Sequence, residues 1–166
     1  MLKKIVLLAF LCLPLGMTAQ EVKIAHVNTR EIYNAMPETA AAETELADLS
    51  QSHRTILQSM EEEYNKEYTE FMQQQDSLEQ SVKVRKIQEV EELRNRMETY
   101  YQQAEQELAK KSNDLQAPIV QKIQTAIKTV GEEQGCTFIM ETGVFLYISP
   151  KAIDATPLVK AKLGLK

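Results

Sequence analysis

Residues 42–71, AETELADLSQSHRTILQSMEEEYNKEYTEF, decide the fold of this chain. They belong to a longer segment, 38–117, that contains neither glycine nor proline and is rich in Glu, Gln, Ala, Leu and Lys, which are strong helix formers. Apolar residues recur in it at spacings of three and four, which places them on one helix face. This first stripe consists of Ala42, Leu46, Leu49, His53, Ile56, Met60, Tyr64, Tyr68 and Phe71. We therefore predict a long amphipathic helix.

A second apolar stripe follows a polar interval, and we expect it to form the returning helix of an antiparallel hairpin. We place the reversal at residues 76–83, where Ser77 or Ser81 could cap the new helix. At a rise of 1.5 Å per residue, two helices of roughly 35 to 40 residues form an arm about 55 Å long. The second stripe consists of Ile87, Val90, Leu93, Met97, Tyr101, Ala104, Leu108, Leu115, Ile119, Ile123, Ala126, Ile127 and Val130.

The residues before the arm predict the first part of a small body. Residues 22–28, VKIAHVN, alternate apolar and polar side chains and include β-branched residues, which is typical of a half-buried strand. Asn28 or Thr29 then caps a short helix. That helix ends at Met36-Pro37, because the residue before a proline avoids the helical region.

The residues after the arm predict the rest of the body. Pro118 lies inside the second stripe, so we expect a kink or local break there, and we expect Gly131 and Gly135 to end the helix. Beyond them we predict two strands joined by a turn, and then a terminal helix with an early-turn proline. The strands are expected at 136–140 and 144–148, the turn at 141–143, and the helix from Asp154 to Gly164.

The predicted fold is α+β and mostly helical. A long antiparallel helical hairpin, a coiled-coil-like arm formed by residues 38–117, projects from a small β body formed by residues 20–37 and 118–166. Three strands and short helices supply too few core residues to support such an arm, and a hairpin of two helices leaves apolar side chains exposed. We expect oligomerisation to complete the body.

The N-terminus predicts export. Lys3 and Lys4 precede an apolar run that is followed by small residues, so residues 1–19 have the order of a secretory signal peptide. The run is about half the roughly 20 residues that a transmembrane anchor needs. A lipid anchor needs a small residue just before a cysteine, but Leu11 precedes Cys12. Cleavage leaves Cys136 as the only cysteine, which we interpret as a small buried hydrophobe.

Charge and motif content exclude several classes of function. The net charge falls from −5 to −7 when the two signal-peptide lysines are removed, and the arm carries 18 acidic against 9 basic residues, which argues against a nucleic-acid binder. Neither His26 nor His53 has metal-ligand spacing, and the chain has no glycine-rich phosphate loop. We therefore expect no enzyme, no metal and no cofactor.

Two groups of arm residues are candidates for binding. Aromatic rings and methionines could line a surface that contacts unfolded chains without selecting a sequence, although the packing of the arm explains them equally well. Lys83, Arg85 and Lys86 form the only dense basic cluster, which is either a solvated helix start or a weak contact for anionic lipid or an acidic partner. The candidates for client binding are Met60, Tyr64, Tyr68, Phe71, Met97, Tyr100 and Tyr101, and Met72 suits the same task.

Three segments of the chain resemble the Skp/OmpH family of periplasmic chaperones, and the resemblance covers nearly the whole mature sequence. The segment 23–32 followed by Met36-Pro37-Glu38 is similar to the family's opening strand and helix. Residues 118–127 are similar to its return from arm to body. Leu146-Tyr147-Ile148, Asp154-Ala155-Thr156 and Leu158-Val159 are similar to its closing strand and terminal helix.

The resemblance implies a homotrimer in the periplasm. Strands from three chains would build the β body, and three hairpins would surround a cavity that holds unfolded outer-membrane β-barrel proteins, without ATP, until they reach the outer-membrane assembly machinery. The trimerisation residues would be Ile24, His26, Val27, Phe138, Ile139, Phe145 and Tyr147.

This chain departs from well-known family members in its charge. Those members are basic, whereas this chain has a pI of about 5.2. Attraction of an acidic client by positive arms is therefore not expected here, and membrane contact is at most weak and confined to the arm tips. The alternative interpretation is a periplasmic coiled-coil spacer or scaffold protein.

Overall fold

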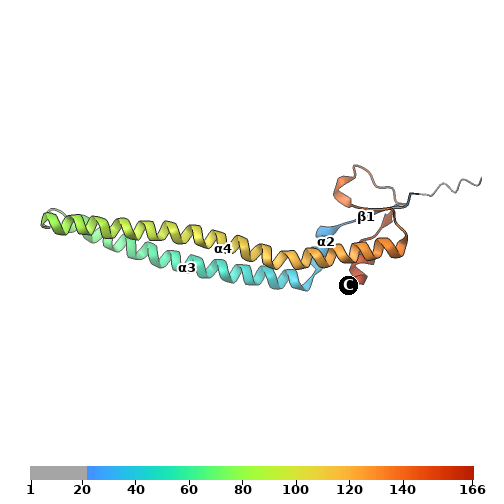
Figure 1. The fold of residues 1–166 in the computed structure, drawn as a ribbon, viewed down its shortest axis with the longest axis horizontal. Helices are drawn as coiled ribbons and strands as arrows, with labels where there is room; N and C mark the ends of the chain where they lie inside the picture. The colour runs from blue at the N-terminus through green and yellow to red at the C-terminus, as the bar shows by residue number, and fades with distance from the viewer. Residues whose placement is uncertain (1–21) are drawn as a thin grey trace, which may run out of the picture.

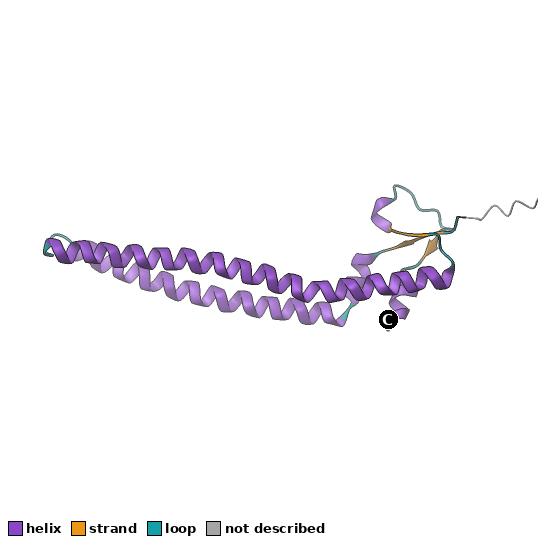
Figure 2. Ribbon diagram, viewed as in Figure 1, coloured by secondary structure: helices purple, strands orange, loops and turns teal. Residues whose placement is uncertain are grey.

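The computed structural model describes residues 22–166, so the expected signal peptide lies outside the described residues. Figure 1 shows a long, narrow pair of helices that projects from a small body at one end. The elements follow the order β1, α2, α3, α4, β2, η2, β3 and α5. The predicted fold class is confirmed: the chain is mostly helical, with one long helical hairpin and a small sheet (Figure 2).

The arm is formed by α3, Pro37–Gln74, and α4, Gln80–Gln134, with the reversal at residues 75–79. The 38 residues of α3 correspond to about 57 Å. Neither of the two serines proposed as caps has that role, because Glu79 is the N-cap of α4 and makes no side-chain cap bond. Ser77 Oγ instead donates to the Gln74 carbonyl at 2.8 Å, and Ser81 Oγ donates to Glu79 Oε1 at 3.2 Å.

The helix α4 runs from the arm tip into the body without interruption. The local break predicted at Pro118 is wrong, because α4 continues through this residue. Proline removes one backbone hydrogen bond, but buried side chains on the following turns anchor the helix to the body, among them Ile119, Ile123 and Val130. Gly131 also lies inside the helix, and only Gly135 ends it, in the left-handed conformation at φ 61°.

The sheet is parallel, with the strand order β2-β1-β3. Strands β1, Ile24–Val27, and β2, Phe138–Glu141, pair along their full length, and β3, Ile153–Asp154, pairs with Ala25 and His26 on the other edge of β1.

The predicted strand at 144–148 is wrong. The 3₁₀ helix η2, Thr142–Val144, and a loop without regular structure occupy this region. Parallel strands need a long connection rather than a tight hairpin. The chain therefore passes through residues 142–152 before β3 can pair with β1 in the same direction.

One face of the sheet packs against helices and forms the core of the body. Ala25 and Val27 point toward α2, Thr29–Ala35, and α5, Thr156–Lys162, together with the body end of α4. Ile32 and Val159 are fully buried between these elements. The Asn28 side chain caps α2 by accepting a hydrogen bond from the Glu31 backbone, as predicted. No helix among residues 22–166 is both long enough and apolar enough to cross a bilayer.

Candidate functional site

The seam of the arm differs from the predicted stripes at four positions. After His53, the buried and half-buried residues of α3 are Leu57, Met60, Tyr64, Glu67 and Phe71. The first step in this series is four residues rather than three. In the seam, Leu57 takes the place predicted for Ile56 and Glu67 that predicted for Tyr68, so Ile56 and Tyr68 lie outside it. The other predicted seam residues of this segment, Met60, Tyr64 and Phe71, keep their places. On α4, Lys86 and Tyr100 occupy seam positions, whereas the neighbouring residues Ile87 and Tyr101 are exposed.

A polar layer crosses the seam near the middle of the arm. His53 is 9% exposed, and its Nδ1 shares a hydrogen bond of 2.8 Å with the Tyr100 hydroxyl. The two rings meet edge to face with centroids 5.7 Å apart. His53 Nε2 lies 3.5 Å from a Glu107 carboxylate oxygen but has no hydrogen-bond partner among the described residues. Both ring nitrogens are therefore directed toward α4, and Nδ1 is hydrogen-bonded within the arm.

A groove of about 660 Å³ runs along one side of the seam next to Tyr101. We call this side of the hairpin the Tyr101 side. Tyr101 is 52% exposed, and a hydrogen bond to the Glu105 carboxylate raises the pKa of its hydroxyl. The groove is lined by Ser50, His53, Arg54, Leu57, Gln58, Glu61, Tyr101, Ala104, Glu105 and Leu108.

A second apolar surface, which we call the distal patch, lies on the same side nearer the tip. It consists of Tyr68, Met72, Val84 and Ile87, which are 44%, 45%, 45% and 39% exposed. Tyr68 lies seven residues after Glu61, and Ile87 lies fourteen before Tyr101. Because residues seven apart share one face of a packed helix, both helices carry the distal patch on the Tyr101 side.

The opposite side of the arm also carries a groove. Its groove, of about 440 Å³, is lined mainly by polar and charged side chains that include Glu92, Arg96 and Gln103. Glu63 contacts Arg96 across this side at 4.0 Å. Ile56 lies seven residues before Glu63 and is therefore on the same face of α3. We call this the Ile56 side.

The seven residues proposed for client binding are divided between the seam and the surface. Only Tyr68 and Tyr101 are exposed. Tyr64 is half-buried and stacks on Tyr68, with ring centroids 5.9 Å apart. Tyr100 is held by His53. The other three candidates are also half-buried: Met60, Phe71 and Met97.

The sequence reasoning missed part of the exposed surface. Val84 is not among the residues predicted to bind clients, and Ile87 is predicted to lie in the seam, but both are exposed. The signal for Ile87 is that the heptad spacing from Tyr101 passes through Arg94 to Ile87. The same spacing from Glu105, which lines the groove, leads to Val84. A continuous stripe drawn through all apolar residues cannot separate seam positions from the positions beside them.

The basic cluster near the tip is largely neutralised. Lys86 Nζ lies 3.1 Å from carboxylate oxygens of both Glu67 and Glu89, and these contacts raise the pKa of Lys86. Arg85 lies 3.5 Å from Glu89. Lys83 alone makes no ion pair among the described residues. Of the three, Lys86 alone takes part in the contact between the two helices.

The sheet has an open face that carries most of the residues proposed for trimerisation. Ile24 pairs with Phe138 and His26 with Met140, so these four side chains share the face opposite the helices. Phe145 and Tyr147 line a small cavity over Ile24 and His26, while Leu146 is fully exposed. Val27 and Ile139 point the other way and pack in the core of the chain itself.

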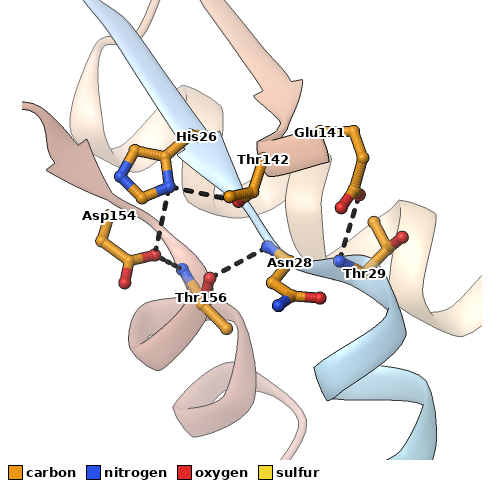
Figure 3. A network of polar contacts seen from close by, with 7 residues as sticks. All are labelled: His26, Asn28, Thr29, Glu141, Thr142, Asp154 and Thr156. Carbon is orange, nitrogen blue, oxygen red and sulfur yellow. Dashed lines mark hydrogen bonds and ion pairs between the residues drawn. The ribbon is translucent and has the colours of Figure 1, made fainter. Parts of the chain in front are cut away.

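A network of polar contacts closes the body around His26. His26 Nδ1 lies 3.3 Å from Thr142 Oγ1 and 3.8 Å from Asp154 Oδ1. Figure 3 shows both contacts as dashed lines. Both contacts meet at one ring nitrogen, so the histidine cannot relay a proton from the hydroxyl to the carboxylate as a catalytic triad does. The network instead joins the ends of β1, β2 and β3.

Asp154 and Glu141 extend this network to the helices. Partial burial raises the pKa of Asp154, but hydrogen bonds from Thr156 outweigh this effect and, with His26, hold the pKa below its ordinary value. The Asn28 amide donates to Thr156 Oγ1 at 3.0 Å, and the Thr29 amide donates to Glu141 Oε2 at 3.1 Å (Figure 3). The start of α2 is thereby fixed to both edges of the sheet.

Comparisons with known proteins agree with this architecture. The chain is 26% identical over 153 residues to the chaperone protein Skp of Yersinia enterocolitica, a match that covers 92% of this chain and 93% of the relative. The crystal structure of an OmpH-like protein from Caulobacter crescentus CB15 is 15% identical and superposes with a TM-score of 0.73 over 84% of this chain and 82% of the other.

The family itself is established by a match to a family model. The relative from Yersinia is named a chaperone protein, which agrees with the expectation that this chain is not an enzyme. The model of the family described as "Outer membrane protein (OmpH-like)" matches residues 23–163, nearly all of the described chain. The chain therefore belongs to the OmpH-like family, and its resemblance to Skp/OmpH chaperones is confirmed.

Proposed function

We propose that this protein is an ATP-independent holding chaperone of the periplasm that binds unfolded outer-membrane β-barrel proteins and prevents their aggregation. The observation that carries the proposal is the Tyr101 side of the arm, where a groove and the distal patch expose aromatic and aliphatic side chains. Large exposed apolar patches on a folded protein mark interaction sites. Many weak contacts of this kind hold a client without selecting a sequence and release it without an energy source.

The open face of the sheet supports assembly into a homotrimer. Phe138 and Leu146 are large apolar residues that a folded single chain leaves exposed. Each square ångström of apolar surface that is buried contributes about 25 cal/mol of stabilisation, which favours covering these residues with another copy of the chain. In a trimer built through this face, three arms surround a cavity. We assign the lining of that cavity to the Tyr101 side and the outer surface to the Ile56 side.

The charge of the arm determines how clients are held. Lys86 and Arg85 at the tip are paired with Glu67 and Glu89, which leaves Lys83 as the one member of the basic cluster without an ion pair among the described residues and little attraction for an acidic client or a lipid surface. Apolar and aromatic contacts therefore carry the binding. Such contacts are not screened by salt, whereas attraction between exposed charges is.

Aggregation of a urea-unfolded outer-membrane barrel upon dilution tests the proposal. We expect mature protein to suppress light scattering with saturation near one trimer per client, and the protection to persist at high salt. Replacing Tyr68 and Tyr101 with serine should weaken protection, while Ile56→Ser, the control on the other side, should not. Absence of protection by a confirmed trimer would reject the proposal for this class of client.

One set of contacts favours the alternative function of a periplasmic spacer. Ion pairs cross the arm at Lys86–Glu67, Lys111–Glu45 and Lys122–Glu38, as expected for a stiff tether. A spacer does not need exposed tyrosines, however, and its seam would be apolar throughout rather than crossed by a polar layer at His53. A stable trimer without client protection would favour the spacer.

A further inference from the structure

We propose that each arm recognises an extended client segment in which two apolar clusters are about six residues apart with a basic residue between them. This inference rests on the proposed chaperone function and names the segment that one arm accepts. It follows from the placement of apolar and charged side chains along the Tyr101 side.

The two apolar surfaces on this side are separated by a fixed distance. Tyr101 borders the groove and Ile87 belongs to the distal patch, fourteen residues away on the same face of α4. At 1.5 Å per residue, they are about 21 Å apart. An extended chain covers this distance in about six residues at 3.3 Å each. A rigid helix thus sets the spacing that a bound segment must match.

The interval between the two surfaces is acidic. Arg94 lies at heptad spacing between Ile87 and Tyr101. Glu91 and Glu98 lie beside it, four residues after Ile87 and three before Tyr101, which are neighbouring positions on the helix surface. On the facing helix, Glu61 lines the end of the groove that is nearer Tyr68. None of these four charged side chains forms an ion pair within residues 22–166. Three carboxylates against one guanidinium favour a basic residue in the middle of the bound segment.

The strands of membrane β-barrels have the periodicity that this surface requires. A transmembrane strand is about 9 to 11 residues long, and its side chains alternate between the apolar and polar faces. Side chains separated by an even number of positions share one face of an extended segment. Two apolar residues six apart in such a strand can therefore contact the groove and the distal patch together.

Fluorescently labelled peptides provide the test. We would measure anisotropy with the mature, assembled protein and sixteen-residue peptides of glycine, serine and threonine that carry two Leu-Phe pairs. The second pair would begin two, six or twelve positions after the start of the first. We expect the six-residue spacing to bind about tenfold more tightly than the others, because only this peptide buries both pairs at once. A central lysine should bind several-fold more tightly than a central glutamate at low salt, and this difference should decrease as salt is added.

Variants with matched controls locate the contacts. Ile87→Ser and Tyr101→Ser should each remove the preference for the six-residue spacing, because either change leaves a single apolar surface. Ile56→Ser replaces an equally exposed aliphatic residue on the opposite side and should leave the preference intact. Sedimentation velocity would show whether each variant keeps its oligomeric state.

The outcomes separate this inference from the chaperone proposal. Equal affinity for all peptides, with barrel aggregation still suppressed, would overturn the segment length and leave the holding function standing. Failure of both measurements would overturn both. Dissociation of the oligomer by Ile87→Ser would also overturn the inference, since it would assign the Tyr101 side to contacts between copies of the chain.

Discussion

At the scale of single residues, the pair formed by His53 and Tyr100 gives the sharpest prediction. Tyr100→Phe removes the partner of a side chain that is 9% exposed, and it should lower the free energy of unfolding by about 1–2 kcal/mol. Adding His53→Leu replaces both polar groups with apolar ones and should restore most of the loss. Urea unfolding of the two single variants and the double variant measures this coupling. Additive effects in the double variant would contradict it.

Asp154 gives a prediction about pH at the same scale. Its pKa is lowered in the folded state, so the stability that it contributes is present above its ordinary titration range and is lost as the pH falls through the folded-state value. We expect wild-type protein to lose more stability than Asp154→Asn between pH 5 and pH 3, because an aspartate carboxyl group of the unfolded chain titrates in this interval. Asp76→Asn, in the arm turn, is the control. Parallel curves for wild type and Asp154→Asn in thermal unfolding would refute the assignment.

At the scale of elements, the end of α4 depends on one glycine conformation. Gly135 has φ 61°, and a Cβ placed there meets no atom within 4 Å, so Gly135→Ala is a change in backbone strain alone. It should destabilise the protein by about 1–2 kcal/mol. Gly143→Ala also meets open space but lacks a positive φ, and it should be neutral or slightly stabilising. Urea unfolding compares the two variants, and equal effects would contradict the explanation.

The elements also show how far the sequence alone predicts this molecule. Helix α2, the two long helices, β1, β2 and α5 follow from periodicity and capping residues, because these are local signals. The strand predicted at 144–148 failed because Val-Phe-Leu-Tyr-Ile has the composition of a strand but lies in the loop that β3 needs to reach β1 in parallel. That requirement comes from pairing across more than a hundred residues and leaves no local trace.

The candidate site was less predictable than the fold for a related reason. Tyr68 and Tyr101 were identified as binding candidates from their residue type, and both are exposed. Ile56 and Ile87 were assigned to the seam, because a helix of 3.6 residues per turn lets several apolar stripes be drawn through one sequence. Only the packing of α3 against α4 selects Leu57 and Lys86 instead.

At the scale of the whole molecule, the open face of the sheet should hold the assembly together. Phe138 projects from β2 and Leu146 from the loop beyond it, and both are largely exposed in the single chain. Central apolar residues of an interface cost about 2 kcal/mol or more when truncated. We therefore expect Phe138→Ser with Leu146→Ser to convert the proposed trimer to monomers at micromolar concentration. Sedimentation equilibrium measures this change.

The control for this prediction lies on the same body but away from the open face. Val120 on α4 and Leu158 on α5 are exposed apolar residues of the helical layer, and their replacement by serine should leave the trimer intact. Circular dichroism should show full helix content in both double variants, because neither touches the seam of the arm. If the oligomer persists when Phe138 and Leu146 are replaced but dissociates when Val120 and Leu158 are replaced, the interface lies on the helices and not on the sheet. The cavity would then be lined by a different side of the arm, and the assignment of the Tyr101 side to clients would fall with it.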